Sequence, residues 1–225
     1  MEISTRKSLF VLFWLHLALG SLLFLSAGTF NYGPGWLFLG TFLACSGAIT
    51  AWFLKYDPKL IAMRVQSSPF EEHEPWQKLF HFCATLSFAA VPVIGGLGHR
   101  FHWSSLGAGW LALGCALMAL GFWIVFHVYR VNAFVSPILE KSAGQKVVAQ
   151  GPYAFVRHPM YSGSILVLTG AALALGSPWA LIGTPFLFAS FILRVVEEEK
   201  FLTSNLAGYE DYQSRVNWRM VPGIW

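Results

Sequence analysis

The sequence predicts an all-helical integral membrane protein, and its composition is the first reason. Hydrophobic residues occupy 56% of the 225 positions and charged residues only 12%, about half of the roughly 25% found in a soluble globular domain. The apolar residues also form long segments that are flanked, not interrupted, by charge. Because a helix needs about 20 apolar residues to cross a bilayer, we expect membrane spans rather than buried helices of a soluble core.

Four such segments come first in the chain. We expect four transmembrane helices, over residues 9–26, 36–54, 79–97 and 106–128. The first lies behind Arg6 and Lys7 and superficially resembles a signal peptide. Since three more spans follow it, we expect this segment to be retained as a membrane helix.

The positions of the basic residues predict an orientation. If the amino terminus is cytoplasmic, 14 of the 15 Lys and Arg residues lie on the cytoplasmic side and only Arg100 lies outside. The opposite orientation would reverse this split, against the positive-inside rule. We therefore predict cytoplasmic amino and carboxyl termini, in what we expect to be a bacterial inner membrane.

A short helical hairpin is expected in the last third of the chain. The 36 residues between Arg157 and Arg194 contain no Asp, Glu, Lys or Arg, and Gly176, Ser177 and Pro178 interrupt them near the middle. Each arm would be about 22 Å long, which is short for a bilayer core of about 30 Å. We expect the hairpin over 159–196, with arms that cross a thinned bilayer or dip only part way.

These elements divide the chain into two regions. Residues 1–130 would hold the four transmembrane helices with a cytoplasmic loop at 55–78, and residues 131–225 would hold the hairpin and a cytoplasmic segment that carries the chemistry. Cys45, Cys83 and Cys115 each lie inside an apolar segment, so they indicate neither a disulfide framework nor a metal cluster. The formal charge of +4 does not indicate nucleic-acid binding, because the placement of the basic residues follows the membrane.

The densest group of chemically useful residues is the run 151–163, at the predicted cytoplasmic mouth of the hairpin. Its sequence is Gly-Pro-Tyr-Ala-Phe-Val-Arg-His-Pro-Met-Tyr-Ser-Gly. Pro159 suits the first turn of a helix, and the N–H groups at such an end attract carboxylate or phosphate. His158 and Tyr161 would share one face of that turn. Taken singly, these residues are also ordinary anchors at a membrane interface.

A run of three carboxylates lies across the hairpin, at Glu197, Glu198 and Glu199. Glu198 is four residues after Arg194, so the two can form an ion pair within one helix, worth about 0.2 to 0.5 kcal/mol. Adjacent carboxylates repel one another and gain little from such a pair. A cationic ligand would compensate their charge better.

In combination, these residues resemble the isoprenylcysteine carboxyl methyltransferase family and the related phospholipid methyltransferases. The shared pattern is Gly-Pro-Tyr, then Arg157-His158-Pro159-Met160-Tyr161 with Gly163, then the apolar hairpin and the Glu197-Glu198 pair. Tyr209, Tyr212 and Pro222 in the tail fit as well. The resemblance covers residues 145–222, while the first four spans match only in being transmembrane.

The resemblance implies S-adenosylmethionine as cofactor, held in a cytoplasmic pocket over the hairpin. The strand-like stretch 145–148 would line the adenosine, Tyr153 would contact the cofactor, and residues 158–161 would hold its amino-acid end. Arg194 would bind the acceptor, and Arg194 and Glu198 would be the catalytic residues. The implied cofactor-binding set is Gln145, Lys146, Val147, Val148, Gly151, Tyr153, Arg157, His158, Pro159, Met160, Tyr161, Glu197 and Glu198. Gln145 and Lys146 match the family only loosely.

The chemistry agrees with this set and leaves the acceptor open. A sulfonium, an ammonium and a carboxylate need acidic groups, cations or N–H donors, and aromatic rings, and this region supplies all three. The first candidate acceptor is the carboxylate of a prenylcysteine or a similar small amphiphile, which is ionised at pH 7 and needs no base. Alternatives are a phospholipid amine such as phosphatidylethanolamine, which needs a base, or a small thiol.

A non-enzymatic alternative is a small polytopic transporter or scaffold in the bilayer. It would explain the topology but not the motif, and a transporter predicts ionisable residues within its spans. Only His16, His81 and His127 lie there, and His73, His99 and His102 lack metal-ligand spacing. The expected partners are the lipid bilayer and a lipophilic acceptor, and the sequence leaves the oligomeric state open.

Overall fold

The computed structural model describes residues 2–58, 60–61, 75–103, 105–134 and 144–225. Every regular element within these residues is a helix, so the all-helical prediction is confirmed. Much of the expected loop at 55–78, including Arg64 and His73, lies outside the described residues, and so does Lys141.

The four predicted spans correspond to four long helices. These are α1 (Glu2–Ala27), α2 (Gly33–Tyr56), α4 (Pro75–Arg100) and α5 (Ala108–Val131). Each contains an apolar stretch long enough to cross a membrane. Large apolar side chains cover the outside of the helices, as at Phe13, Phe82 and Leu193. Because exposed apolar surface of this extent is unfavourable in water, the bundle is that of an integral membrane protein.

The hairpin is present, but its two arms differ in length. Its first arm is α6 (Pro159–Ala174), a short apolar helix of 16 residues. A turn and the 3-10 helix η3 (Pro178–Ile182) lead into α7 (Gly183–Asn205), and residues 178–205 form a fifth stretch long enough to span. The expected short second arm is therefore longer than predicted, because the helix continues through Glu197–Glu199 instead of ending at the charges.

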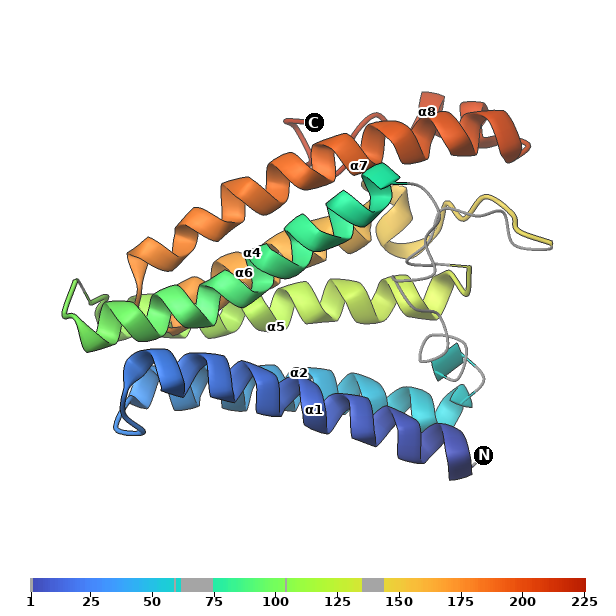
Figure 1. Cartoon of the computed structure of the whole chain (residues 1–225). Coiled ribbons are helices and arrows are strands. Elements are labelled where there is room, and N and C mark those ends of the chain that lie inside the picture. The colour runs from blue at the N-terminus through green and yellow to red at the C-terminus, as the bar shows by residue number, and fades with distance from the viewer. Residues whose placement is uncertain (1, 59, 62–74, 104, 135–143) are drawn as a thin grey trace.

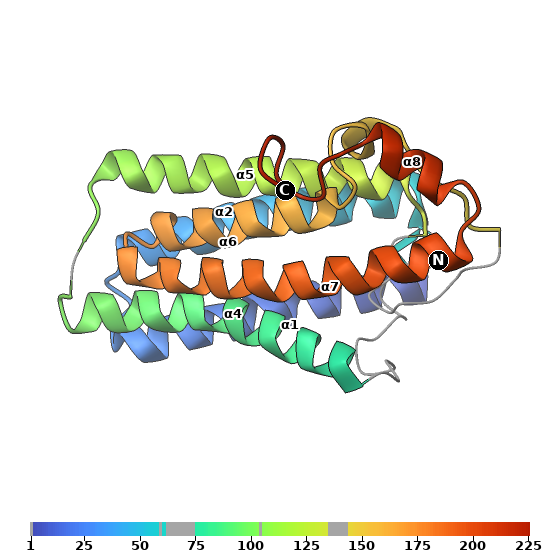
Figure 2. The same ribbon diagram turned by 90° about the horizontal axis from the view of Figure 1, so that it is seen from above.

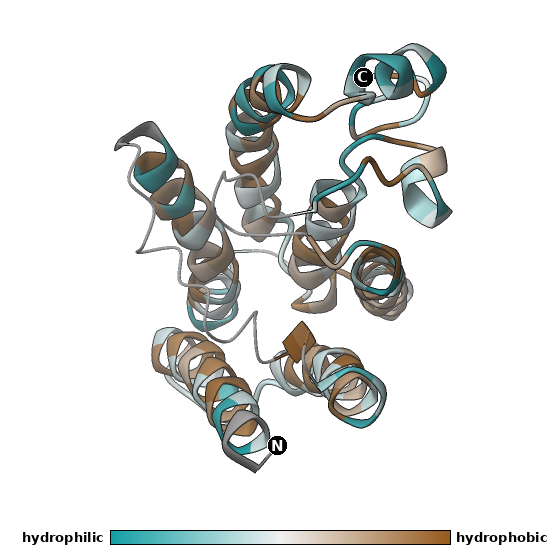
Figure 3. Ribbon diagram, turned by 90° about the vertical axis from the view of Figure 1, so that its right-hand side faces the viewer, coloured by the Kyte–Doolittle hydropathy of each residue, from teal (hydrophilic) through white to brown (hydrophobic). Residues whose placement is uncertain are grey.

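The helices lie side by side, with the short carboxyl-terminal helix α8 (Tyr209–Arg215) at one end (Figure 1). The amino terminus, the carboxyl end of α7 and α8 all lie at this end (Figure 2). Arg100, at the close of α4, lies at the opposite end. Seen along the bundle, hydrophilic residues gather in the carboxyl-terminal elements (Figure 3). This end is where a polar site can be built.

Glycines hold α6 tightly against α5. The two helices run antiparallel, with Gly114 facing Gly170 and Gly121 facing Gly163. A Cβ atom added at Gly121 would lie only 2.6 Å from the carbonyl oxygen of Gly163. Small residues at this spacing let membrane helices approach backbone to backbone, so α5 fixes the position of α6.

The far end of α6 is also fixed. The Tyr32 hydroxyl, in the turn between α1 and α2, donates a hydrogen bond of 2.5 Å to the Leu175 carbonyl, with the Gly95 carbonyl 3.3 Å away. The Tyr32 ring is stacked on the imidazole of His99, with centroids 4.2 Å apart. The helix that begins at the motif is therefore held along its length and at its distal end.

Candidate functional site

The first turn of α6 is held by the carboxyl-terminal tail. The backbone N–H of Arg157 donates to the Trp218 carbonyl at 2.9 Å, and that of His158 donates to the Arg219 carbonyl at 2.8 Å. Pro159 is the first residue of the helix, as the sequence predicts. The tail therefore lies along the motif and fixes its backbone, although the two are about 60 residues apart in the chain.

Glu199 links the motif, α7 and the tail. Its Oε1 accepts a 2.6 Å bond from Nε of Arg157 and lies 3.3 Å from Nε2 of His158, and its Oε2 accepts a 2.9 Å bond from Nε of Arg219. The side chain is only 6% exposed. Arg157 also donates to the carbonyls of Val216 and Asn217. The Arg157 guanidinium is thus used in holding the site together.

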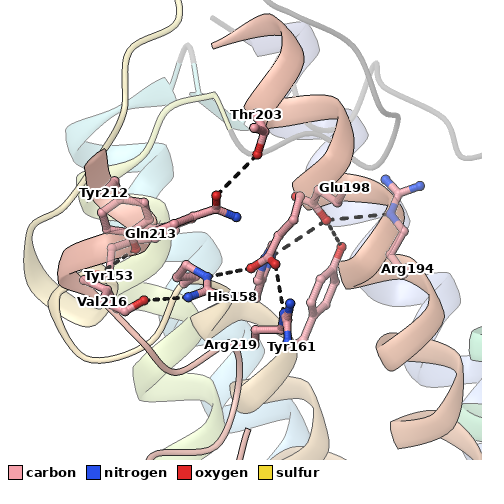
Figure 4. Close-up of polar contacts among 12 residues, drawn as sticks. Tyr153, His158, Tyr161, Arg194, Glu198, Thr203, Tyr212, Gln213, Val216 and Arg219 are labelled. Carbon is pink, nitrogen blue, oxygen red and sulfur yellow. Dashed lines mark hydrogen bonds and ion pairs between the residues drawn. The ribbon is translucent and has the colours of Figure 1, made fainter. Parts of the chain in front are cut away.

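Glu198 is the more accessible carboxylate of the same cluster (Figure 4). Its Oε2 accepts a 2.6 Å hydrogen bond from the Tyr161 hydroxyl. The same oxygen lies 3.9 Å from Nδ1 of His158 and 3.8 Å from Nε of Arg194. The Glu198 side chain is 24% exposed, so this carboxylate can meet a ligand.

The Tyr161 ring is packed between neighbours. It is stacked with the His158 imidazole, with centroids 5.7 Å apart, and with the Phe191 ring at 4.5 Å. These contacts fix the direction of the Tyr161 hydroxyl toward Glu198. Both stacking contacts of the Tyr161 ring are therefore with side chains of the protein itself.

Arg194 lies on the side of the cluster that faces the helices. It is buried, and its guanidinium lies over the ring of Phe80 on α4, 5.4 Å from the centroid. Phe80 in turn packs against Phe191, with centroids 5.8 Å apart. A cation in this place borders the apolar interior of the bundle on one side and Glu198 on the other.

Tyr153 lies in a second cluster beside the first. It is part of the 3-10 helix η2 (Gly151–Ala154), where Gly151 has a positive φ of 58°. The Tyr153 hydroxyl accepts a 2.9 Å bond from the Asn132 side chain, and its carbonyl accepts a 2.8 Å bond from the Tyr212 hydroxyl. The apolar members of this second cluster are Leu206, Tyr209, Tyr212 and Val216, packed with Val147, Ala149, Tyr153 and Leu202.

The structure brings together most of the residues that the sequence indicated. His158, Tyr161, Arg194 and Glu198 meet directly, and Tyr153 lies in the same region (Figure 4). In the stretch 145–148, Lys146 is exposed while Gln145, Val147 and Val148 are half-buried, and no strand forms there. Met160 is half-buried in the first turn of α6.

Glu197 is placed away from this group. Its carboxylate is 44% exposed and pairs with Lys200 at 2.6 Å. The inward carboxylate is Glu199, which the spacing argument from Arg194 overlooked. A different signal could have found it, since Leu187, Phe191 and Val195 form a buried stripe at intervals of four residues and Glu199 continues that stripe. Arg219 carries no comparable signal in the sequence, whereas Tyr209 was noted there only as part of the family resemblance.

Residues 110–207 match the model of the family described as phospholipid methyltransferase. This region includes α6, α7, the motif and the carboxylate run. The family resemblance seen in the sequence is confirmed.

A solved structure shares the fold of this chain. It is the eukaryotic intramembrane Ras methyltransferase, an isoprenylcysteine carboxyl methyltransferase. The two are 22% identical, with a TM-score of 0.51, and the match covers 99% of this chain and 85% of the other. A search of curated proteins found no match. The bundle therefore has the fold of a known membrane methyltransferase.

The charged side chains around the start of α6 make a mixed site. Two carboxylates, Glu198 and Glu199, lie among three guanidinium groups, those of Arg157, Arg194 and Arg219. Among the described residues, no group of three or more His, Cys, Asp or Glu side chains is arranged to hold a metal ion. Such a site suits an organic ligand that carries charges of both signs, because each sign finds a partner.

Proposed function

We propose that this chain is an S-adenosylmethionine-dependent membrane methyltransferase that binds its cofactor at the polar end of the bundle, within residues 131–225. The observation that carries the proposal is the environment of Oε2 of Glu198, which Tyr161, His158 and Arg194 approach from three directions. The family match and the shared membrane fold support the same reaction class.

The chemistry of the donor set fits the cofactor. S-adenosylmethionine supplies a methyl group bound to a sulfonium, and it carries an ammonium and a carboxylate on its amino-acid end. Glu198 would accept from the ammonium. If Nε2 of His158 donates to Glu199, its Nδ1 is an acceptor as well. Nδ1 of His158 and Oε2 of Glu198 lie 3.9 Å apart, so both atoms could accept hydrogen bonds from the same ammonium group.

We assign the aromatic contact to Tyr153. Tyr161 is stacked with His158 and Phe191, whereas Tyr153 is half-buried in the second cluster, together with Val147. An aromatic face attracts a cation by about 0.5 to 2 kcal/mol. Val147 and Val148 would line the nucleoside, and Arg157 would support the site through Glu199 without touching the ligand.

Arg194 would hold the acceptor. Its guanidinium lies over the ring of Phe80, which packs against Phe191, so a lipophilic molecule could place an anionic head against it and its chain along the helices. A guanidinium binds a carboxylate through two parallel hydrogen bonds. Because that carboxylate is already ionised near pH 7, the protein needs only to align the reactants and to exclude water.

We place O-methylation of a prenylcysteine carboxylate, or of a similar small amphiphile, first among the acceptors. The fold shared with the isoprenylcysteine carboxyl methyltransferase supports it. The description of the matching family favours a second candidate, N-methylation of a phospholipid such as phosphatidylethanolamine. That reaction needs a base to take a proton, and Glu198 or His158 would supply it while Arg194 held the phosphate.

We also propose that this end of the bundle faces the cytoplasm of a bacterial cell. The amino terminus and the site share one end, while Arg100 lies at the other. Basic residues are retained on the cytoplasmic side of a membrane. Cofactor made in the cytoplasm would then reach the site directly.

The proposal is tested by transfer of labelled methyl from S-adenosylmethionine in detergent micelles. The acceptors offered are a farnesylated cysteine, phosphatidylethanolamine and a small alkyl thiol, with buffer alone as the blank. We expect the labelled methyl group on the prenylcysteine, and we expect base to release it, because base hydrolyses a methyl ester. Base-stable label on the lipid amine would select the second candidate, and label on no acceptor, with no binding of the cofactor, would refute the enzyme assignment.

A further inference from the structure

The hydroxyl of Tyr209 is buried and has no hydrogen-bond partner among the described residues. The residue is only 4% exposed. Neighbouring tyrosines differ, because the Tyr161 hydroxyl donates to Glu198 and the Tyr212 hydroxyl donates to the Tyr153 carbonyl. A buried hydroxyl without a partner destabilises a protein, so proteins keep few of them. The hydroxyl of Tyr209 is therefore a candidate to form a hydrogen bond with a bound ligand.

The backbone places this side chain in the second cluster of the site. Gly208 has a φ of 81°, and this left-handed turn lets Tyr209 begin α8 directly after α7 ends at Asn205. The Tyr209 ring packs in the second cluster and lies against Tyr212, with centroids 5.7 Å apart. Val147 and Tyr153, which we assign to the nucleoside, belong to the same cluster.

The polar end of the side chain lies near the charged cluster. The hydroxyl lies within electrostatic reach of the carboxylates of Glu199 and Glu198 and of the Arg157 guanidinium. Burial, with the two carboxylates adding to it, raises the pKa of Tyr209, so the phenol keeps its proton at physiological pH. It can therefore donate one hydrogen bond and accept another.

We infer that the Tyr209 hydroxyl is a hydrogen-bonding contact of the bound nucleoside-sulfonium cofactor, between its adenosine and its amino-acid end. The inference rests on the proposed function. It adds a cofactor contact from α8, outside the motif of residues 151–163 and outside α7. It also gives α8, the short helix that begins at Tyr209, a role in the site.

The test uses Tyr209→Phe in the full-length, detergent-purified protein. S-adenosylhomocysteine, the demethylated product form, is titrated by calorimetry, and the melting temperature is measured without ligand. We expect affinity to fall about 3- to 10-fold, the size of one net hydrogen bond. We expect the melting temperature without ligand to stay level or to rise, because the variant removes a buried polar group that no protein group satisfies.

Tyr212→Phe is the matched control, since it removes a hydroxyl that donates to the Tyr153 carbonyl at 2.8 Å. That variant is expected to melt at a lower temperature without ligand. Unchanged affinity in Tyr209→Phe would overturn the inference, and so would a fall in its ligand-free melting temperature like that of Tyr212→Phe. Failure of the wild-type protein to bind would instead refute the proposed function itself.

Discussion

The hydroxyl of Tyr161 lies 2.6 Å from Oε2 of Glu198 and donates a hydrogen bond to it across the hairpin. One partner comes from the first turn of α6 and the other from the carboxyl half of α7. The bond fixes the most accessible carboxylate of the charged cluster without neutralising it. It therefore prepares an acceptor group for a cation.

Tyr161→Phe should weaken the cofactor site while keeping its packing. The ring would still stack on His158 and Phe191, but Glu198 would lose the donor that holds its carboxylate. We expect the KM for S-adenosylmethionine to rise about 3- to 10-fold, as for the loss of one net hydrogen bond. Tyr56→Phe, at an exposed tyrosine on α2, is the control and should leave this KM unchanged.

Arg194→Ala should mainly impair use of the acceptor. Removing a guanidinium that grips a carboxylate costs about 1.5 to 3 kcal/mol, so kcat/KM for the acceptor should fall about 10- to 100-fold. Arg215→Ala, at an arginine that donates to the Asp211 carbonyl of its own helix, is the control. Steady-state assays at saturating cofactor give the comparison, and unchanged methylation kinetics in Arg194→Ala would remove Arg194 from the acceptor site.

Glu199→Gln should destabilise the protein. The carboxylate is buried with Arg157 and Arg219, and neutralising it would leave their charges uncompensated. Breaking a buried ion pair on one side costs about 3 to 5 kcal/mol. We expect a clearly lower melting temperature in detergent, measured by intrinsic fluorescence. Glu197→Gln changes the same group at an exposed site and should melt like the wild type, so equal melting of all three proteins would contradict the structural role of Glu199.

Gly121→Ala should disrupt the pairing of α5 with α6. The new Cβ would meet the Gly163 carbonyl oxygen at 2.6 Å, and a backbone atom cannot move aside as a side chain can. Gly47→Ala on α2 is the matched control, because no atom lies within 4 Å of its added Cβ. In a helix interior, Ala is favoured over Gly by about 1 kcal/mol. The control should therefore be neutral or stabilising, while Gly121→Ala lowers the melting temperature; equal effects would argue against close packing.

The sequence predicted the membrane helices well because their signal is local. Long apolar segments, separated by short polar or Gly-containing connections, define the spans of α1, α2, α4 and α5, and Pro159 marks the start of α6. The length of α7 could not be read in this way. Charged residues usually end a span, but here Glu199 pairs within the protein, so the helix continues to Asn205.

The site was predictable only where its residues lie in one short run. His158 and Tyr161 are neighbours on a single helical turn, and Arg194 and Glu198 are four residues apart on another. The contacts of Arg219 with Glu199, and of the Trp218 carbonyl with the motif backbone, join distant parts of the chain. Neither the hydrophobic periodicity nor the spacing of residues in the sequence predicts such contacts, so the tertiary structure was needed to find them.

The central claim is that the Glu198 carboxylate binds the ammonium group of S-adenosylmethionine. Calorimetric titration of the detergent-purified wild type, Glu198→Gln and Glu197→Gln with this cofactor tests it most directly. The account predicts saturable binding by the wild type, affinity lower by about 10-fold or more in Glu198→Gln, as for a lost charge-assisted hydrogen bond, and wild-type affinity in Glu197→Gln. Equal affinity in Glu198→Gln and the wild type would contradict it.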